Sequence, residues 1–213
     1  MIDESVEDPD RAARRALLEA LSLAFRDNPM NVAIHGPRPR RRVRANRAGL
    51  RALVLDTAGQ TVTRVIRDQE RIVGGFVAAP PGLFPVVVPN LHRQIACYVT
   101  QGARAMERWS EVSSNLGEYR PDQDHWYLAV LGVIPECQGR GLGGRLIDEL
   151  IRRVDADPHP LYLESDREAS VRFYLSRGFT VRAEETLDGV RCWCLGRGFA
   201  GANEDLCDSV RES

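Results

Sequence analysis

The segment VIPECQGRGLGGRLIDELIRR, residues 133–153, constrains the fold more than any other part of the chain. It continues the nearly unbroken apolar run of residues 125–135, HWYLAVLGVIP, which predicts a central strand covered on both faces. Four glycines then precede an amphipathic helix predicted over residues 140–155, although each glycine disfavours a helix by up to about 1 kcal/mol. The glycines therefore indicate that an accessible main chain matters more in this turn than a stable first turn of the helix.

A helix N-terminus exposes unpaired N–H groups and a partial positive charge, so it binds a phosphate that can approach the backbone closely. Glycine permits that approach, and several glycines allow successive amides to point at one centre. The side chains of Gln138 and Arg140 are further donors in this turn. The glycines are Gly139, Gly141, Gly143 and Gly144. A pyrophosphate is the ligand that we expect here.

Three other interpretations of the turn are weaker. A Walker loop ends in Gly-Lys-Ser/Thr, and all 29 positively charged residues of this chain are arginines. A dinucleotide fingerprint follows the first strand of a parallel βαβ unit, whereas GRGLGG lies late in the chain and fits the spacing loosely. A ligand-free structural turn leaves the cost of four glycines unexplained.

Hydrophobic periodicity predicts the remaining elements. Helices are expected over residues 10–27, 36–55 and 167–179, a strand over 160–166, and hairpins over 61–79 and 180–197, the second turning at Asp188-Gly189. The proline-rich residues 80–90 are expected to leave the sheet, and residues 91–118 to form loops and helices. No first strand is evident in residues 1–8. The fold class is mixed α/β (α+β) with a largely antiparallel sheet, as a single domain of residues 1–198 and a frayed tail of residues 199–213.

Composition excludes several classes of protein. A net charge of −1 argues against a nucleic-acid partner. No apolar run approaches the ~18 residues of a membrane helix, and the acidic N-terminus is not a secretory signal, so we expect a cytoplasmic protein. The cysteine and histidine spacing supports neither disulfides nor a metal site, and Cys192 and Cys194 are interpreted as buried thiols. The arginine-rich start of the helix at residues 36–55 is interpreted as a solvated face rather than an anion-binding patch.

The segment LGVIPECQGRGLGGRLIDEL resembles the acetyl-CoA-binding motif of the GCN5-related N-acetyltransferases, Q/R-x-x-G-x-G/A, with Gln138, Gly141 and Gly143 at its fixed positions. That family also carries FY followed by GF on its next helix, and residues 171–179 are VRFYLSRGF. More narrowly, the segments AFRDNP, YLE, FYLSRGF and RCWCLGR resemble the puromycin N-acetyltransferase branch. The similarity covers most of the chain and is weak from about residue 60 to residue 120.

This resemblance implies the GNAT fold, with splayed central strands, and acetyl-CoA as the cofactor. The central strand is then expected to pair with the pantetheine amides as if they were an added strand. Ser170 takes the position where the family often has an asparagine that contacts the cofactor. The expected cofactor-binding residues are Leu131, Gly132, Val133, Gln138, Gly139, Arg140, Gly141, Leu142, Gly143, Gly144, Ser170 and Phe173.

The same resemblance assigns catalytic roles. Tyr174 is the expected general acid, which protonates the departing CoA thiolate, although core packing beside Phe173 is the alternative. Glu164 at the end of YLE is the first candidate for the general base, and His125 is the second; either has a structural role as its alternative. Direct attack by an amine needs no covalent enzyme intermediate, so Cys137 is expected to be incidental.

The acceptor pocket is expected from the loop that follows the first helix, around residues 27–30, with Tyr98, Met106, Trp109 and Tyr127 as further lining candidates. The predicted function is acetyl-CoA-dependent N-acetylation of a small-molecule primary amine, such as an aminonucleoside or another antibiotic. A non-catalytic acyl-CoA sensor and a protein N-acetyltransferase are the alternatives. The sequence does not specify the oligomeric state, and a homodimer is among the states that it allows.

Overall fold

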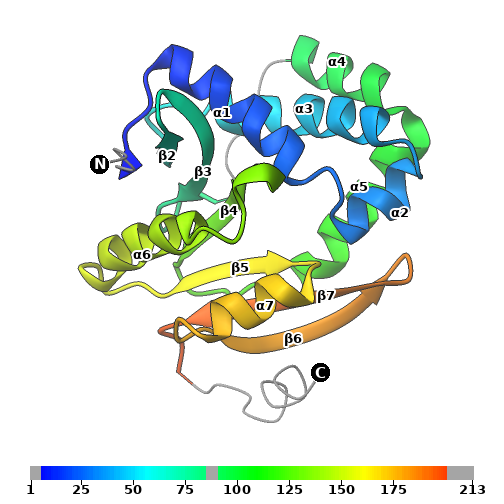
Figure 1. Cartoon of the computed structure of the whole chain (residues 1–213). Helices are drawn as coiled ribbons and strands as arrows, with labels where there is room; N and C mark the ends of the chain where they lie inside the picture. Colours follow the sequence, from blue (N-terminus) through cyan, green and yellow to red (C-terminus); the bar gives the residue numbers. More distant parts are fainter. Residues whose placement is uncertain (1–5, 85–90, 201–213) are drawn as a thin grey trace.

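The computed structural model describes residues 6–84 and 91–200 (Figure 1). A seven-stranded sheet crosses the protein in the order β1-β2-β3-β4-β5-β7-β6. β4 and β5 pair in parallel and the other neighbours pair antiparallel, which confirms the predicted mixed sheet. The strands are β1 (Val6–Glu7), β2 (Val62–Asp68), β3 (Arg71–Ala79), β4 (Trp126–Val133), β5 (Leu161–Ser165), β6 (Thr180–Leu187) and β7 (Val190–Arg197).

Helices cover both faces of this sheet. α6 and α7 pack on one face, where Ile147 and Val171 join Phe76 in the largest core cluster. On the other face, α1 and α3 pack against β2 and β3, and α2 and α5 pack against β4, β5 and β7. The helices are α1 (Arg11–Ala24), α2 (Pro29–His35), α3 (Pro39–Leu55), α4 (Leu91–Gln101), α5 (Ala103–Gly117), α6 (Leu142–Asp155) and α7 (Glu168–Leu175), and a 3-10 turn covers Pro135–Cys137.

α2 is absent from the sequence-based expectation, which placed a loop around residues 27–30. α1 ends at Ala24, before Asn28-Pro29, and Pro29 then opens a second helix as its first helical residue. Proline suits that position because its fixed φ is already helical and the N–H that it lacks would have no helical acceptor. The prediction was therefore wrong about a loop and right about the break.

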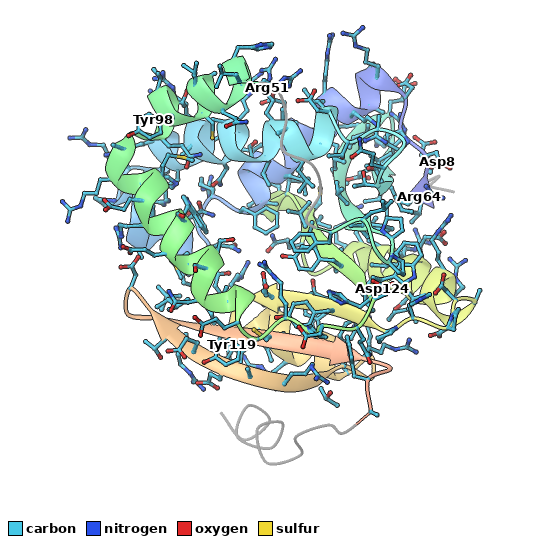
Figure 2. All side chains as sticks on the ribbon, turned by 180° about the vertical axis from the view of Figure 1, so that it is seen from behind. Asp8, Arg51, Arg64, Tyr98, Tyr119 and Asp124 are labelled. Atoms are coloured by element: carbon cyan, nitrogen blue, oxygen red, sulfur yellow. The ribbon has the colours of Figure 1, made fainter. Side chains whose placement is uncertain are left out.

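The N-terminal strand, which the sequence does not reveal, consists of two residues. Val6 pairs with Ile66 and Glu7 with Val65 at the edge of the sheet. Just beyond β1, Asp8 forms an ion pair with Arg64 of β2, and both residues lie at the same edge in Figure 2. A strand this short has no detectable period, which explains why it was missed.

The C-terminal hairpin has the predicted turn. Asp188 and Gly189 both have positive φ, at 53° and 75°, as a type I′ turn requires. Cys192 and Cys194 are buried free cysteines on β7, as expected. Burial raises the pKa of Cys192 to about 12 and that of Cys194 to about 11, so both remain unreactive thiols at neutral pH.

Arg42 differs from the solvated arginine face that was expected for α3. Its side chain is buried, and its Nη2 donates to the carboxylate of Asp27 at 2.6 Å. Its Nε and Nη1 donate to the main-chain oxygens of Arg26 and Gly36. This arginine therefore holds α3 against the segment that links α1 to α2.

Two of the predicted segments fall partly outside the described residues. These are residues 85–90 of the proline-rich segment and residues 201–213 of the tail. Phe199, at the start of that tail, packs beneath the guanidinium of Arg182, whose central carbon lies 4.5 Å from the ring centroid. Within the residues that the structure describes, no helix combines the length and apolar character needed to cross a membrane.

Candidate active site

A cleft of about 620 Å³ lies between the second half of β4, the start of α6, and α7. β4 pairs with β5 at Trp126 and Tyr127, after which the two strands diverge (Figure 1). On its other side, β4 carries a bulge, since Val77 pairs with Val130 whereas Ala78 pairs with Leu128. A bulge bends and twists its strand, which directs the second half of β4 away from β5. The expected splay thus has a local cause.

The exposed edge of β4 forms one wall of the cleft. Leu131, Gly132 and Val133, the three residues expected to pair with pantetheine, all line it. Gly132 is required by close packing as well, because a Cβ there would lie 2.9 Å from the Cβ of Ala24 at the end of α1. The end of α1 therefore closes one side of the cleft.

The glycine turn forms its floor. Gly139 and Gly141 have φ values of 75° and 79°, in the left-handed region that favours glycine. Gly141 is the N-cap of α6 and has no side chain to bond with the N–H groups of the first turn. Leu142, Gly143 and Gly144, which belong to that turn, line the cleft. A positive helix end thus faces the cavity, as the run of glycines indicated.

The side chains of Gln138 and Arg140 are engaged within the protein. Gln138 lines the cleft, and its Nε2 donates to the main-chain oxygen of Val133 at 2.8 Å. Nη1 of Arg140 donates to Asp68 of β2 at 2.6 Å, and this hydrogen bond lowers the pKa of Asp68. Arg140 is not among the residues that line the cleft. Both contacts fix the turn in place. The N–H groups of these two side chains, which were expected to bind the ligand, donate instead to oxygens of the protein.

Two arginines that the sequence analysis did not single out line the cleft. Arg167 is the N-cap residue of α7, and Arg177 follows the same helix. The guanidinium carbon of Arg177 lies 4.0 Å from the ring centroid of Phe173, and its Nε bonds Asp148 on α6. The four-residue spacing from Phe173 to Arg177 within the helix predicted over residues 167–179 was the available signal, although α7 itself ends at Leu175. Ser170 and Phe173 line the cleft as expected.

Tyr174 lies behind Phe173, in the core rather than in the cleft lining. Its side chain is buried, and its ring centroid lies 5.2 Å from that of Phe173 and 5.3 Å from that of Phe179. Burial raises the pKa of Tyr174 above its ordinary value, so the phenol keeps its proton across the neutral range. The phenol thus stays protonated at neutral pH, and Tyr174 is not among the residues that line the cleft.

Glu164 belongs to a polar cluster on the opposite face of the sheet. Its Oε1 accepts from Nε of Arg120 at 2.8 Å, and its Oε2 accepts from the hydroxyl of Tyr127 at 2.8 Å. The Arg120 guanidinium lies over the ring of Phe84, 4.9 Å from the centroid, and the rings of Phe84 and Tyr127 are 4.0 Å apart. Burial and the adjacent carboxylate raise the pKa of Tyr127 well above its ordinary value. A carboxylate and two aromatic rings therefore meet beside the splay.

The other acceptor candidates are dispersed. Trp109 donates from Nε1 to Nε2 of His35, and His125 stacks edge-on against Tyr162. Tyr98 and Met106 line a separate hollow between α3 and α4, away from the cleft. The structure thus does not gather these candidates at one place.

Of residues 27–30, which were expected at the acceptor pocket, Asn28 lines the cleft. The Nδ2 of Asn28 donates to Asp166, just after β5, at 3.1 Å. The main-chain amide of Met30 donates to the other oxygen of Asp166 at 2.8 Å. The start of α2 is thereby attached to the end of β5.

The chain is similar in sequence to a family of known proteins. The model of the "Acetyltransferase (GNAT) family" matches residues 16–179, which is more than half of the chain. The chain belongs to this family. It is therefore a GNAT-family N-acetyltransferase, and the matched range includes the cleft, the glycine turn and all of α7.

Solved structures show the same GNAT fold. A histone acetyltransferase HPA2 and related acetyltransferase from Corynebacterium glutamicum superposes with a TM-score of 0.68 at 21% identity, covering 95% of this chain and 99% of that one. A polyamine N-acetyltransferase from Drosophila melanogaster gives 0.58 at 20% identity over 91% and 97%. A PaiA N-acetyltransferase from Thermoplasma acidophilum, in complex with coenzyme A, gives 0.56 at 12% identity over 93% and 100%.

Proposed function

We propose that this GNAT protein transfers the acetyl group of acetyl-CoA to the primary amine of a small molecule. The observation that carries the proposal is the uncapped N-terminus of α6, which faces a cleft whose wall is the exposed edge of β4. Both features fit coenzyme A, because its diphosphate suits a positive helix end and its pantetheine amides suit a strand edge. When bound, acetyl-CoA supplies an activated thioester.

The chain's own groups then have defined tasks. Main-chain N–H groups of Leu131 to Val133 would hold the pantetheine and stabilise charge on the thioester oxygen. Arg167 and Arg177 would add positive charge at the phosphates. Because Tyr174 lies behind the cleft lining, its phenol would give its proton to the departing thiolate through a bridging water. The buried thiol of Cys137 takes no part, because the amine attacks directly.

The amine would approach from the face of the sheet that carries Glu164. The carboxylate of Glu164 would accept the proton that the ammonium must lose, and Tyr127 would orient the carboxylate through its hydrogen bond. The rings of Phe84 and Tyr127 would suit a planar acceptor. An aminonucleoside such as puromycin is the acceptor we propose first, in agreement with the resemblance of FYLSRGF and RCWCLGR to that branch.

The test combines binding with turnover. Calorimetry should show one molecule of acetyl-CoA bound per chain, and a thiol-release assay should show turnover with at least one amine of a panel that includes puromycin and agmatine. Mass spectrometry should show an increase of one acetyl group in that amine. Absence of acetyl-CoA binding by folded protein would count against the proposal as a whole, whereas binding without turnover on puromycin would count against that acceptor.

A further inference from the structure

A second hollow, of about 410 Å³, lies where the end of α2 and the start of α3 meet the start of α5. α2 and the first half of α5 lie side by side in Figure 1. This hollow shares none of its lining residues with the acetyl-CoA cleft. It is therefore a separate site, which the proposed acetyl transfer does not use.

The N-terminus of α5 opens into this hollow. α5 is a helix of 15 residues whose N-cap, Gly102, has no side chain to bond with the N–H groups of the first turn. The first main-chain hydrogen bond of the helix runs from the amide of Met106 to the oxygen of Gly102 at 3.1 Å. Ala103 and Ala105 of the preceding turn line the hollow. The N–H groups of this turn have no acceptor within the helix, so this end of α5 carries a partial positive charge.

His35 also lines the hollow and carries a buried donor. The side chain is 3% exposed, and its Nε2 accepts a hydrogen bond from Trp109 Nε1–H at 3.2 Å. In a neutral ring the proton then belongs to Nδ1. This Nδ1 is buried and has no hydrogen-bond partner within the described part of the chain. A buried N–H without an acceptor carries a desolvation cost, which a ligand oxygen would relieve.

Three guanidinium groups from two helices surround the same hollow. Arg108 is already engaged by Asp188 and by the main-chain oxygen of Ala33. Arg41 of α3 and Arg104 of α5 have exposed side chains, and no carboxylate pairs with either among residues 6–84 and 91–200. Burial lowers the pKa of His35, and the positive charges of Arg41 and Arg108 lower it further. The lowered pKa favours the neutral ring, which lies close to both charges.

We propose that this hollow binds a phosphate-type oxyanion. The amides of the first turn of α5 and the Nδ1–H of His35 would donate to the oxyanion from two directions, and Arg41 and Arg104 would approach from the open side. Converging donors from three helices suit a tetrahedral anion with several oxygens better than a planar carboxylate. The phosphate can be inorganic phosphate or the phosphate group of an ester, because the recognised chemistry is the same.

The deciding experiment follows the His35 ring by NMR while inorganic phosphate is added at constant ionic strength. Phosphate should saturate one site and raise the pKa of His35, because a nearby negative charge favours the protonated ring. The ring signal is the appropriate readout because phosphate can also enter the cleft at α6, which would contribute heat in calorimetry. An unchanged His35 signal up to high phosphate would overturn the proposal.

Substitutions of the arginines that line the hollow test whether the phosphate binds there. Arg41→Gln and Arg104→Gln should each weaken phosphate binding at His35 about tenfold, as expected for loss of one charged hydrogen bond. Arg40→Gln is the matched control, because Arg40 is exposed on the same helix and does not line the hollow. Since all three side chains are exposed, folding should persist, and a thermal melt verifies it. Equal phosphate affinity in the three variants would show that the ion binds elsewhere.

A final titration distinguishes inorganic phosphate from a phosphate ester as the ligand. Phenyl phosphate is titrated in the same way and compared with inorganic phosphate. Tighter binding of the ester supports a phosphorylated organic ligand, and tighter binding of inorganic phosphate supports the free ion. Failure of both to shift His35 contradicts the site.

Discussion

Met30 donates its main-chain amide to the carboxylate of Asp166 at 2.8 Å, across 136 positions of sequence. Burial, the largest influence, raises the pKa of Asp166 from its ordinary 3.8, although this hydrogen bond and that of Asn28 oppose the shift. The partly buried carboxyl of Asp166, at the junction of α2 and β5, therefore makes the folding stability depend on pH.

The sign of that response follows from the raised pKa. The folded protein holds this proton more tightly than the unfolded chain, so the stability it contributes is complete below pH 3.8 and is lost as pH rises through the raised value. Asp166→Asn removes this titration and keeps an oxygen for the Met30 amide. Urea unfolding between pH 3.5 and 7 should show the wild type losing stability relative to the variant as pH rises. Parallel profiles would contradict this account.

Tyr174→Phe should lower kcat by about 10²–10⁴-fold if the phenol protonates the leaving thiolate. Affinity for acetyl-CoA should stay the same, because Tyr174 lies behind the cleft lining. The raised pKa of Tyr174 also predicts that wild-type kcat shows no loss from this group below about pH 10. Tyr119→Phe is the control, since the hydroxyl of Tyr119 bonds Glu185 near the β6–β7 hairpin (Figure 2). A Tyr174 variant with unchanged kcat would assign the residue to core packing.

The sequence predicted best what depends on local backbone chemistry. Positive φ at Gly139, Gly141 and Gly189 could be expected because glycine is favoured there. The mixed sheet and the strand before the glycine turn likewise followed from periodicity and apolar runs. α2 was missed because Asn28-Pro29 marks the end of one helix and the start of another equally well.

Contacts between distant segments could not be predicted in the same way. Arg140 is bound by Asp68, which lies 72 positions earlier, and no local pattern links the two residues. The bulge that bends β4 involves Ala129, a residue without a turn preference. Glu164 was singled out from YLE, whereas its partner Arg120 comes from a segment of weak resemblance. The direction in which a side chain points depends on its packing against distant segments. The sequence of its own segment does not specify that packing.

Gly141→Ala should separate backbone strain from cofactor binding. A Cβ at Gly141 meets no atom within 4 Å, so the cost comes from its φ of 79° and is about 1–2 kcal/mol of unfolding free energy. Gly59→Ala is the matched control, because Gly59 has a φ of 87° and equally open space outside the cleft. Chemical denaturation should give similar losses for the two variants, and calorimetry should show weaker acetyl-CoA binding in Gly141→Ala alone. Equal affinities would indicate that the turn does not hold the cofactor.

Glu164→Gln should affect both stability and turnover. The variant leaves Arg120, whose side chain is 22% exposed, without its carboxylate partner, at a cost of about 1–3 kcal/mol. Loss of the base should also lower kcat/KM for the amine about 10²-fold or more, with acetyl-CoA affinity unchanged. Glu184→Gln removes a more exposed pair with Arg191 and should cost less than about 1 kcal/mol without a change in rate. Full activity in a folded Glu164→Gln variant would show that another group is the general base.

Arg177→Gln should weaken acetyl-CoA binding by roughly tenfold, because one charged hydrogen bond to a phosphate is typically worth about 1.5–3 kcal/mol, and Asp148 already neutralises part of this guanidinium. The effect should be larger at low salt, since the cleft is open to solvent and screening weakens exposed charges. Arg172→Gln on α7 is the control, because Arg172 pairs with Glu168 and does not line the cleft. Calorimetry at 20 mM and 300 mM salt measures both variants. If the two variants bind acetyl-CoA equally well, Arg177 serves to join α6 to α7 through Asp148 and is not a phosphate ligand.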